Sequence, residues 1–448
     1  MDDDRALFTD LYELTMGAVY FAEDLDTPAS FELFVRGMPR GRNFMVAAGL
    51  EQVLDYLEDL QLEPHHIEYL HSLKMFDPAF VDHLAGLRFT GDVWAMPEGT
   101  IFFPDEPVIR ITAPRIQAQL VETFLLTTIN FQSMIASKAA RILIATDGRP
   151  FVDFSPRRDH GLDAANSAAR ASYIAGAAGT SNVVAGMRYG MPVSGTMAHS
   201  FVMSYEDELD AFCAYLRVFP DHPTLLIDTY DIQQGALNAI EAHRRMSEHG
   251  ARVGSVRIDS GSVGDEARSV RKLLDQAGLE EVKIFVSGDL DEYTIDELLR
   301  SGAPADAFGV GTRLGVSADA PYLPGVYKLV DDRLGPRLKT SVGKETLPGA
   351  KQVWRRIQDG TFAGDVIGLQ SESFDGGTPL LRQVMSAGQR LEPALPLGEI
   401  KEYCTAQVEQ LPAAFRSLDQ TEPYPVELSP AMAGLREDLR AHYSDRAG

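Results

Sequence analysis

Short apolar runs alternate with amphipathic stretches through the middle of the chain. Six of these runs are rich in β-branched and aromatic residues, which is typical of buried strands. They begin at Phe151 (FVDFS), Pro192 (PVSGT), Thr224 (TLLIDTY), Ser255 (SVRIDSG), Lys283 (KIFVSGD) and Asp306 (DAFGVGT). Between them the hydrophobic spacing predicts helices over Glu206–Phe219, Gln233–Gly250, Asp265–Gly278 and Asp291–Gly302. Strand and helix in alternation predict parallel strands joined by right-handed crossovers.

Each strand-like run ends in a small or acidic polar residue. In an α/β barrel the carboxyl ends of the strands form one ring, so these side chains would surround a single pocket. An open sheet would instead bind a ligand at one switch point. We favour the barrel, because no strand–G-x-G-x-x-G–helix unit supports a dinucleotide-binding sheet; polar loops without a ligand are the simpler alternative. The ends are Ser155, Thr196, Asp228, Asp259, Ser287–Gly288 and Gly311–Thr312.

The pattern changes on both sides of this region. Residues 1–115 mix helical stretches with strand-like runs and predict an α+β N-terminal domain. Residues 116–326 then contain one long helix or two, followed by the α/β barrel with the active site. Residues 327–448 predict antiparallel strands and a helical tail, a C-terminal extension whose packing partner could be the N-terminal domain.

Composition narrows the class of protein. The chain has 448 residues and a net charge of −24, which disfavours nucleic acid or an anionic membrane as a partner. It has two cysteines, Cys213 and Cys404, and the start MDDDRALFTDLYELTM lacks the build of a signal peptide. We therefore expect a reducing compartment, the cytoplasm. No stretch approaches the roughly 18 unbroken apolar residues of a spanning helix.

Charged residues at the strand ends are the first candidates for chemistry. Arg157 and Arg158 follow the first strand in DFSPRRDHG, and paired guanidiniums match a carboxylate or a phosphate. Salt bridges to neighbouring acids are the alternative. Asp228 and Asp259 could hold sugar hydroxyls or a Mg²⁺ ion that bridges them to a pyrophosphate. They could equally cap the helices that follow.

Glycines at two strand ends suggest phosphate binding. In VSGDLDEYT and FGVGTRLG, glycine lets the backbone approach an anion closely, and the amides that follow point toward it. Glycine is also common at such turns without a ligand. Together with the arginine pair and the two carboxylates, these ends fit a doubly phosphorylated sugar better than each does alone.

Two histidines compete for a catalytic role. His199 follows a strand end in GTMAHSF, where a nucleophilic histidine that accepts a phosphoryl group is feasible. A lone histidine is more often a hydrogen-bonded structural residue. His160, in RRDHG, is the competitor. The remaining cluster, PHHIEYLH, lies outside the barrel and has no cysteine spacing of a zinc site.

Along most of its length the chain resembles the nicotinate phosphoribosyltransferase family. The resemblance rests on ordered motifs: TDLYELTM, FELFVRGMPRGRNFMVAAGL, RR at 157–158, GTMAHSF, LLIDTYD, RIDSG, SGDL, FGVGT, GVYKLV and TLPGAKQVWR. It implies the type II phosphoribosyltransferase fold, an irregular parallel α/β barrel beside an α+β domain, in a homodimer. The implied enzyme joins nicotinate to phosphoribosyl pyrophosphate in the presence of Mg²⁺. It couples the reaction to ATP hydrolysis through a phosphohistidine.

The resemblance also assigns roles to residues. His199 would be phosphorylated, and Tyr12 would stack near the pyridine ring. Asp228 and Asp259 would act on the ribose hydroxyls and Mg²⁺, with Asp259 as the metal ligand. Arginines would face the nicotinate carboxylate or the pyrophosphate, and glycine-bearing strand ends the 5′-phosphate. The substrate-binding set is Tyr12, Arg157, Arg158, Thr196, Arg257, Ser287, Gly288, Gly309, Gly311 and Thr312.

The chain departs from the family pattern at two positions. The family often has an acid after DSG, where this chain has Ser262, and many relatives have glycine where this chain has Ser155. Three rival functions remain. A nicotinamide phosphoribosyltransferase would use the same site for an uncharged amide, and a quinolinate phosphoribosyltransferase would share the fold without ATP coupling. A catalytically silent protein would bind pyridine nucleotides only.

Overall fold

The computed structural model describes residues 2–221, 223–341 and 343–447. They form two compact units. We call residues 135–321 the central unit, and residues 1–134 with 322–448 the flanking unit. No helix in the described ranges is long and apolar enough to cross a lipid bilayer.

The flanking unit contains three sheets. The largest has the strand order β13-β12-β1-β5-β3-β17-β18, the second β16-β14-β15-β19, and β2 pairs with β4. The strands are β1 (Pro28–Val35), β2 (Met45–Val46), β3 (Asp92–Ala95), β4 (Ile101–Phe102), β5 (Ile109–Pro114), β12 (Gly325–Asp332), β13 (Gly335–Pro336), β14 (Lys351–Gln358), β15 (Thr361–Leu369), β16 (Gly377–Pro379), β17 (Arg382–Ser386), β18 (Gln389–Arg390) and β19 (Val426–Leu428). Every pair of neighbouring strands in the largest sheet is antiparallel.

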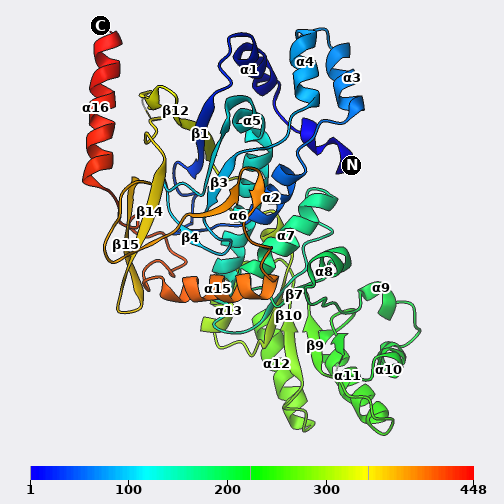
Figure 1. Cartoon of the computed structure of the whole chain (residues 1–448). Coiled ribbons are helices and arrows are strands. Elements are labelled where there is room, and N and C mark those ends of the chain that lie inside the picture. The colour runs from blue at the N-terminus through cyan, green and yellow to red at the C-terminus, as the bar shows by residue number, and fades with distance from the viewer. Residues whose placement is uncertain (1, 222, 342, 448) are drawn as a thin grey trace. The chain divides into compact units, whose positions relative to one another are not determined.

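Helices surround these sheets in both segments of the flanking unit. The C-terminal helix α16 lies against β15 (Figure 1). The long helix α6 (Glu122–Ala145) begins in this unit and ends in the central one. The other helices are η1 (Asp2–Leu7), α1 (Leu11–Ala22), α2 (Leu50–Glu58), α3 (Pro64–Ser72), α4 (Pro78–Ala85), α5 (Arg115–Leu120), α15 (Leu397–Gln410) and α16 (Pro430–Ala447).

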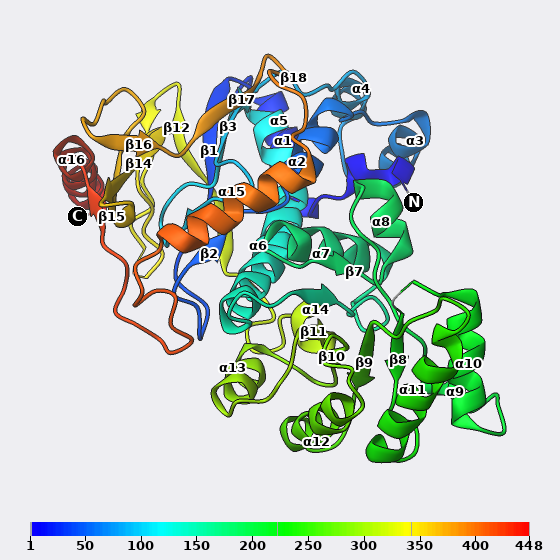
Figure 2. The ribbon, with the colours of Figure 1, turned by 90° about the horizontal axis from the view of Figure 1, so that it is seen from below.

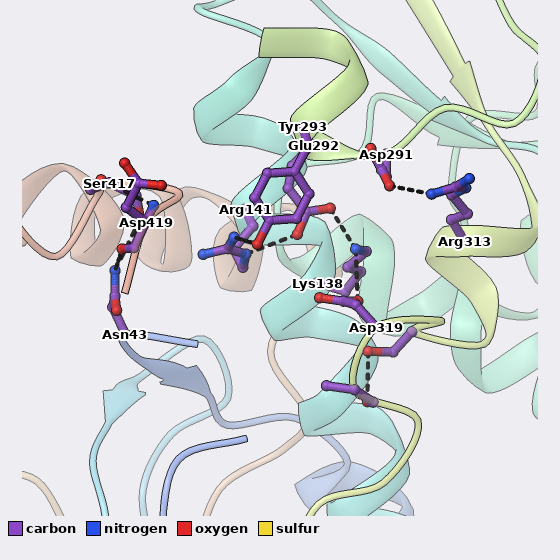
Figure 3. Close-up of polar contacts among 12 residues, drawn as sticks. Asn43, Lys138, Arg141, Asp291, Glu292, Tyr293, Arg313, Asp319, Ser417 and Asp419 are labelled. Atoms are coloured by element: carbon purple, nitrogen blue, oxygen red, sulfur yellow. Dashed lines mark hydrogen bonds and ion pairs between the residues drawn. The ribbon is translucent and has the colours of Figure 1, made fainter. Parts of the chain in front are cut away.

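Segments from both ends of the chain share the flanking unit. Strand β1 pairs with β5 on one side and with β12 on the other, and all its residues after Pro28 are buried. The Asn43 amide donates hydrogen bonds to the carbonyl oxygens of Ser417 (3.0 Å) and Asp419 (2.8 Å), as Figure 3 shows. The C-terminal extension thus completes the sheet to which β1 belongs. The chain passes from the flanking unit to the central unit between residues 134 and 135, and returns between residues 321 and 322.

A parallel sheet forms the centre of the central unit. Its order is β7-β6-β11-β10-β9-β8, and all its pairs are parallel. The strands are β6 (Phe151–Asp153), β7 (Gly179–Thr180), β8 (Thr224–Leu226), β9 (Ser255–Ile258), β10 (Lys283–Val286) and β11 (Ala307–Val310). Among the described residues no pairing joins β7 to β8, so the sheet is an incomplete barrel. The predicted α/β class with parallel strands is confirmed.

Helices follow the strands as the alternating pattern predicts. Figure 2 shows α11, α12 and α13 on one side of strands β8 to β11. The apolar face of α12 packs through Val270 and Leu274, and the helix lies against β9 and β10. The helices are α7 (Leu162–Ile174), α8 (Val183–Tyr189), α9 (His199–Val202), α10 (Glu208–Val218), α11 (Ile232–Ser247), α12 (Val263–Gln276), α13 (Glu292–Arg300) and α14 (Thr312–Gly315).

One predicted strand is wrong. The run PVSGT forms only a single parallel bridge, between Val193 and Thr180, and the two-residue strand β7 beside it was not predicted. Pro192 has no N–H to donate to a ladder, which limits the pairing to the bonds around Thr180. Because Gly179 lies against the carbonyl of Pro192, the two segments still approach closely. Thr196 therefore follows a bridged loop rather than a strand.

A close contact between β8 and α11 gives the first prediction. A Cβ atom on Gly235, in the first turn and a half of α11, would lie 2.0 Å from the carbonyl oxygen of Ile227. The carbonyl oxygen belongs to the backbone and cannot turn aside, so Gly235→Ala would force the helix away from the strand end. We expect the free energy of unfolding to fall by about 2 kcal/mol, the usual cost of overpacking a core. Urea unfolding followed by circular dichroism measures this change.

Gly398→Ala is the matched control. Gly398 is also helical, in α15, but a Cβ atom there would meet nothing within 4 Å. Alanine should leave stability unchanged or raise it by up to about 1 kcal/mol, because glycine is a poor helix former. Equal urea midpoints for Gly235→Ala and wild type would contradict the close contact.

Candidate active site

The carboxyl edge of the parallel sheet gathers most of the predicted residues. Asp228 and Asp259 lie just beyond the ends of β8 and β9, and Ser287 directly follows β10. Gly311 directly follows β11, and Ser155 lies two residues beyond β6. Parallel strands place their carboxyl ends at one edge, so residues far apart in the sequence meet there.

Arg257 connects three parts of this edge. Its Nη2 donates to Asp259 Oδ1 over 2.7 Å and its Nε to Ser287 Oγ over 2.8 Å. Its Nη1 donates to Thr196 Oγ1 over 3.0 Å. The guanidinium also lies over the ring of Phe154, 5.3 Å from the centroid. Arg257, Thr196, Asp259 and Ser287 therefore form one bonded cluster.

Asp228 joins this cluster through a backbone bond. Its Oδ2 accepts hydrogen bonds from the Asp259 N–H (3.0 Å) and from Ser260 Oγ (2.6 Å). It does not cap the following helix; Asp231 does so by accepting from the Gln234 N–H. The buried Oδ1 of Asp228 has no hydrogen-bond partner within the described ranges. An unsatisfied buried carboxylate oxygen is a ready ligand for a cation or a hydroxyl.

A second carboxyl with an unpartnered oxygen, Glu208, belongs to the same electrostatic neighbourhood. Its Oε2 accepts from Asn238 over 2.9 Å, and its buried Oε1 finds no hydrogen-bond donor in the described part of the chain. Burial raises the pKa of Glu208, and the negative charges of Asp207 and Asp228 raise it further. Glu208 was not among the predicted site residues, because an acid in the first turn of an amphipathic helix is ordinary.

Gly288 is required by the close approach of two strand ends. Its φ is +94°, and a Cβ atom would lie 2.1 Å from the carbonyl oxygen of Asp259. Gly309 is buried in β11, where a Cβ atom would lie 2.6 Å from the ring of Phe154. Gly311 and the exposed Thr312 begin the short helix α14. Gly288 and Thr312 are thus open to a ligand, while Gly309 leaves room for the ring beneath Arg257.

The arginine pair is exposed. Neither Arg157 nor Arg158 has a side-chain hydrogen bond or an ion pair among the residues that the structure describes, so the salt bridges considered as an alternative are not found there. The loop itself is held by the Arg158 N–H, which donates to the Ser155 carbonyl (2.7 Å), and by Ser155 Oγ, which donates to Asp159 (3.0 Å). Both guanidiniums remain available to an anion.

Two carboxyls at this loop, one at its start and one within it, were not among the predicted site residues. Asp153 is fully buried at the end of β6 and accepts hydrogen bonds from the Ser155 N–H (2.9 Å) and Thr180 Oγ1 (2.8 Å). Burial raises the pKa of Asp153. Burial also raises the pKa of Asp159 to about 6, with a contribution from the negative charge of Asp153. Asp159 was visible in the motif FSPRRDHG, but nothing in the sequence indicated that it would be partly buried.

His199 is half-buried at the start of α9. Its Nδ1 lies 3.2 Å from Thr229 Oγ1, the residue after Asp228. This contact leaves Nε2 as the nitrogen for a ligand when Nδ1 carries the proton and donates it to Thr229. His160 is exposed in the arginine loop.

Tyr12 belongs to the flanking unit, on the first turn of α1. Its side chain is exposed, and partial burial together with the negative charges of Glu122 and Glu13 raises the pKa of its phenol. The phenol is therefore neutral at physiological pH, and its ring face is available for stacking.

One group of three potential metal ligands occurs among the described residues, in the flanking unit. Asp4 Oδ1 lies 3.1 Å from the Nε2 atoms of both His65 and His66. The Nδ1 of His66 accepts a hydrogen bond from the Glu63 N–H, so its Nε2 carries the proton and donates to Asp4. The geometry is thus that of hydrogen bonds, and they lower the pKa of Asp4.

The sequence is similar to known nicotinate phosphoribosyltransferases along nearly its whole length. Models of the nicotinate phosphoribosyltransferase N-terminal and C-terminal domains match residues 7–130 and 376–436. Nicotinate phosphoribosyltransferase pncB2 of Mycobacterium tuberculosis is 47% identical over 99% of this chain and 95% of its own length. The Bacillus subtilis nicotinate phosphoribosyltransferase is 36% identical over 96% of this chain and 94% of its own.

Solved structures agree with the sequence comparison. Human nicotinic acid phosphoribosyltransferase superposes with a TM-score of 0.86 at 30% identity, covering 96% of this chain and 99% of its own. Nicotinate-nucleotide pyrophosphorylase from Pyrococcus furiosus gives a TM-score of 0.75 at 26% identity, covering 92% and 97%. Both structures share the α/β fold of this chain. The chain belongs to the nicotinate phosphoribosyltransferase family.

The raised pKa of Asp159 gives the second prediction. A carboxyl whose pKa is higher in the folded than in the unfolded protein binds its proton more tightly when folded. The wild type should therefore lose stability relative to Asp159→Asn as the pH rises from about 4 to about 6. We expect a relative loss of about 1 kcal/mol, less than the full shift would give because this loop is partly solvated.

Urea unfolding of both proteins at about pH 4.5 and about pH 7.5 measures this difference. Asp163→Asn, which changes an exposed carboxyl on α7, serves as the control. A constant difference between wild type and Asp159→Asn over this range would show that Asp159 titrates as an ordinary solvated carboxyl.

Proposed function

We propose that this chain joins nicotinate to phosphoribosyl pyrophosphate and gives nicotinate mononucleotide and pyrophosphate, a step of NAD salvage. The observation that carries the proposal is the bonded cluster of Arg257, Asp259, Ser287 and Thr196 at the carboxyl edge, beside an exposed arginine pair. It combines fixed carboxylates for a ribose with free cations for phosphates. The names and full-length similarity of the relatives support the same reaction.

In this proposal each part of the edge binds one part of the substrates. Gly288 and Gly311, with the hydroxyl of Thr312, receive the 5′-phosphate, because their backbone is open to close approach. Arg157 and Arg158 face the pyrophosphate or the nicotinate carboxylate, whose paired oxygens match a guanidinium. Tyr12 stacks on the pyridine ring.

The chemistry needs stabilisation of charge more than it needs a strong base. The bond between the anomeric carbon and the pyrophosphate oxygen breaks, and the ribose gains oxocarbenium character. Asp259 and Asp228 stabilise that positive charge, while the arginines stabilise the departing pyrophosphate. The pyridine nitrogen then donates its lone pair to the anomeric carbon. That nitrogen carries no proton in nicotinate, so no proton has to be removed.

The same carboxylates fit a Mg²⁺ ion. The buried Oδ1 of Asp228 lacks a partner in the described ranges, and the Oδ2 of Asp259 takes no part in the bonds of the cluster. Oxygen ligands of this kind suit Mg²⁺, which usually retains water and contacts substrate phosphates. We infer that Asp259, with Asp228, would hold the ion, which would neutralise charge on the pyrophosphate when bound.

The third prediction identifies the reaction by its product. We would incubate the protein with phosphoribosyl pyrophosphate and Mg²⁺ and each of nicotinate, nicotinamide and quinolinate, with and without ATP. Nicotinate mononucleotide is expected, with little product from the other bases. Asp259→Asn should lower kcat by about a hundredfold or more, the usual loss when one electrostatic stabiliser is removed.

Asp275→Asn is the control, because Asp275 lies on α12 and pairs with Arg271, one turn earlier on the same helix. A nicotinamide or quinolinate product would assign the chain to one of the rival activities. Binding of phosphoribosyl pyrophosphate in calorimetry without release of pyrophosphate would identify a silent binder.

We further propose that ATP drives the reaction through His199. Its Nε2 lone pair attacks the γ-phosphorus of ATP, the bond to the bridging oxygen breaks, and ADP leaves. The Nδ1 proton stays on the ring and donates to Thr229 Oγ1, which orients the imidazole. The phosphorylated form would favour tight substrate binding, and its hydrolysis would release product.

The fourth prediction tests this role with γ-labelled ATP. Wild type should take up acid-labile label, and His199→Ala should take up none, while basal transfer without ATP persists. His160→Ala is the matched control, since His160 is the competing histidine of the same unit. Equal labelling of wild type and His199→Ala, or loss of label in His160→Ala alone, would overturn the assignment.

The setting of the enzyme is also a proposal. Cys213 and Cys404 are both buried and unpaired, which supports a reducing compartment such as the cytoplasm. We infer a homodimer from the family resemblance; sedimentation velocity would measure the mass.

A further inference from the structure

Two cations of helix α6 are buried in the central unit. Lys138 and Arg141 are each 1% exposed. A buried ammonium or guanidinium is costly unless it is paired and hydrogen-bonded. The sequence predicts this stretch only as a helix that leads into the barrel, and it assigns no role to either residue.

Both cations meet a single buried carboxylate. Glu292 is fully buried, and its Oε2 lies 2.5 Å from Lys138 Nζ, while its Oε1 accepts from Arg141 Nε over 2.9 Å. Lys138 Nζ also donates to Asp319 Oδ1 over 2.8 Å. Arg141 Nη2 reaches the hydroxyl of Tyr293 over 2.9 Å. Figure 3 shows these side chains pointing toward one another; we call them the Lys138 cluster.

The two acids of the Lys138 cluster follow the two glycine-bearing strand ends. Glu292 is the first residue of α13 and comes directly after residues 287–291. Asp319 follows α14, which begins directly after Gly311. The ammonium of Lys138 therefore bridges the two segments that follow the glycine-bearing ends of β10 and β11.

A second ion pair joins the same two segments nearer to solvent. Arg313 Nη1 donates to Asp291 Oδ2 over 2.6 Å, and Asp291 also caps α13 through the Thr294 N–H. The side chain of Arg313 is 49% exposed, so this pair alone would be weakened by solvent. The link through Lys138 is better shielded, because the ammonium and Glu292 are both buried and only Asp319 is partly exposed.

We propose that Lys138 is a positioning residue that holds the 287–291 and 311–312 strand ends at the separation needed to bind the phosphate of the phosphoribosyl substrate. The inference rests on the proposed function. Without the ammonium, Glu292 keeps its bond to Arg141 but Asp319 and Glu292 lose the group that bridges them. Their mutual repulsion is then no longer offset between them, and the two ends separate. Since Lys138 would act only through these acids, it affects binding of the phosphorylated substrate and not of the base.

The fifth prediction follows from Lys138→Met, which keeps the length of the side chain and removes its charge. The KM for phosphoribosyl pyrophosphate should rise about tenfold or more, because small displacements of binding groups are costly. The KM for nicotinate should change by less than about twofold, as expected for an uncoupled site. Asp319→Asn should raise the KM for phosphoribosyl pyrophosphate by a smaller factor. Lys138→Arg, which retains the charge, should raise this KM less than Lys138→Met does.

Lys351→Met is the matched control. Lys351 is an equally buried lysine, paired with the buried Glu32 over 2.7 Å in the flanking unit. It should lower the Tm without a selective rise in the KM for phosphoribosyl pyrophosphate. If both variants change the two KM values alike, Lys138 has a purely structural role and the proposal fails.

Two further measurements keep the test decisive. If Lys138→Met does not fold, Asp319→Asn decides: its side chain is 30% exposed, and an unchanged KM for phosphoribosyl pyrophosphate would overturn the proposal. Calorimetry with ribose 5-phosphate needs no turnover. If Lys138→Met binds ribose 5-phosphate more weakly than wild type, the positioning role is supported. This holds even if the wild type forms no nicotinate mononucleotide, a result that would refute only the proposed function.

Discussion

The guanidinium of Arg257 holds together the edge on which the site depends. It donates to Thr196, Asp259 and Ser287, and thereby joins a bridged loop with the ends of β9 and β10. The planar group offers donors in fixed directions, so each bond restrains the others. The backbone N–H of Asp259 in turn donates to Asp228 Oδ2 and thereby orients that carboxylate. The carboxylates that we assign to the ribose are therefore oriented by bonds already present in the protein.

The sequence predicted the sheet and much of its carboxyl edge, because both follow from local patterns. Apolar runs with polar ends identified β6, β8, β9, β10 and β11. The pattern failed where pairing is reduced to a single bridge, at Val193, and where a strand has only two residues, as in β7. Pro192 and the small residues around it gave no reliable sign of how far pairing would extend.

Contacts that arise from packing could not be predicted. Glu208, Asp153 and Asp159 look like ordinary helix or loop acids, and only the folded chain buries the first two and partly buries the third. Lys138 and Arg141 resemble the polar face of a long helix until Glu292, more than a hundred residues away, is placed between them. The predicted role of Gly309 as a substrate contact also stays untested, although its packing against Phe154 explains the absence of a side chain.

The two departures from the family pattern each have a local compensation. Ser155 fits because position 315 is glycine; a Cβ atom there would lie 2.4 Å from the Cβ of Ser155. Its hydroxyl then donates a hydrogen bond to Asp159 within the arginine loop. Ser262 stands before α12, whose first turn carries Asp265 and Glu266, so that turn keeps its negative charge. The charged residues that the proposed mechanism requires at the carboxyl edge, Arg257, Asp228 and Asp259, are all present, so the two departures give little support to a catalytically silent protein.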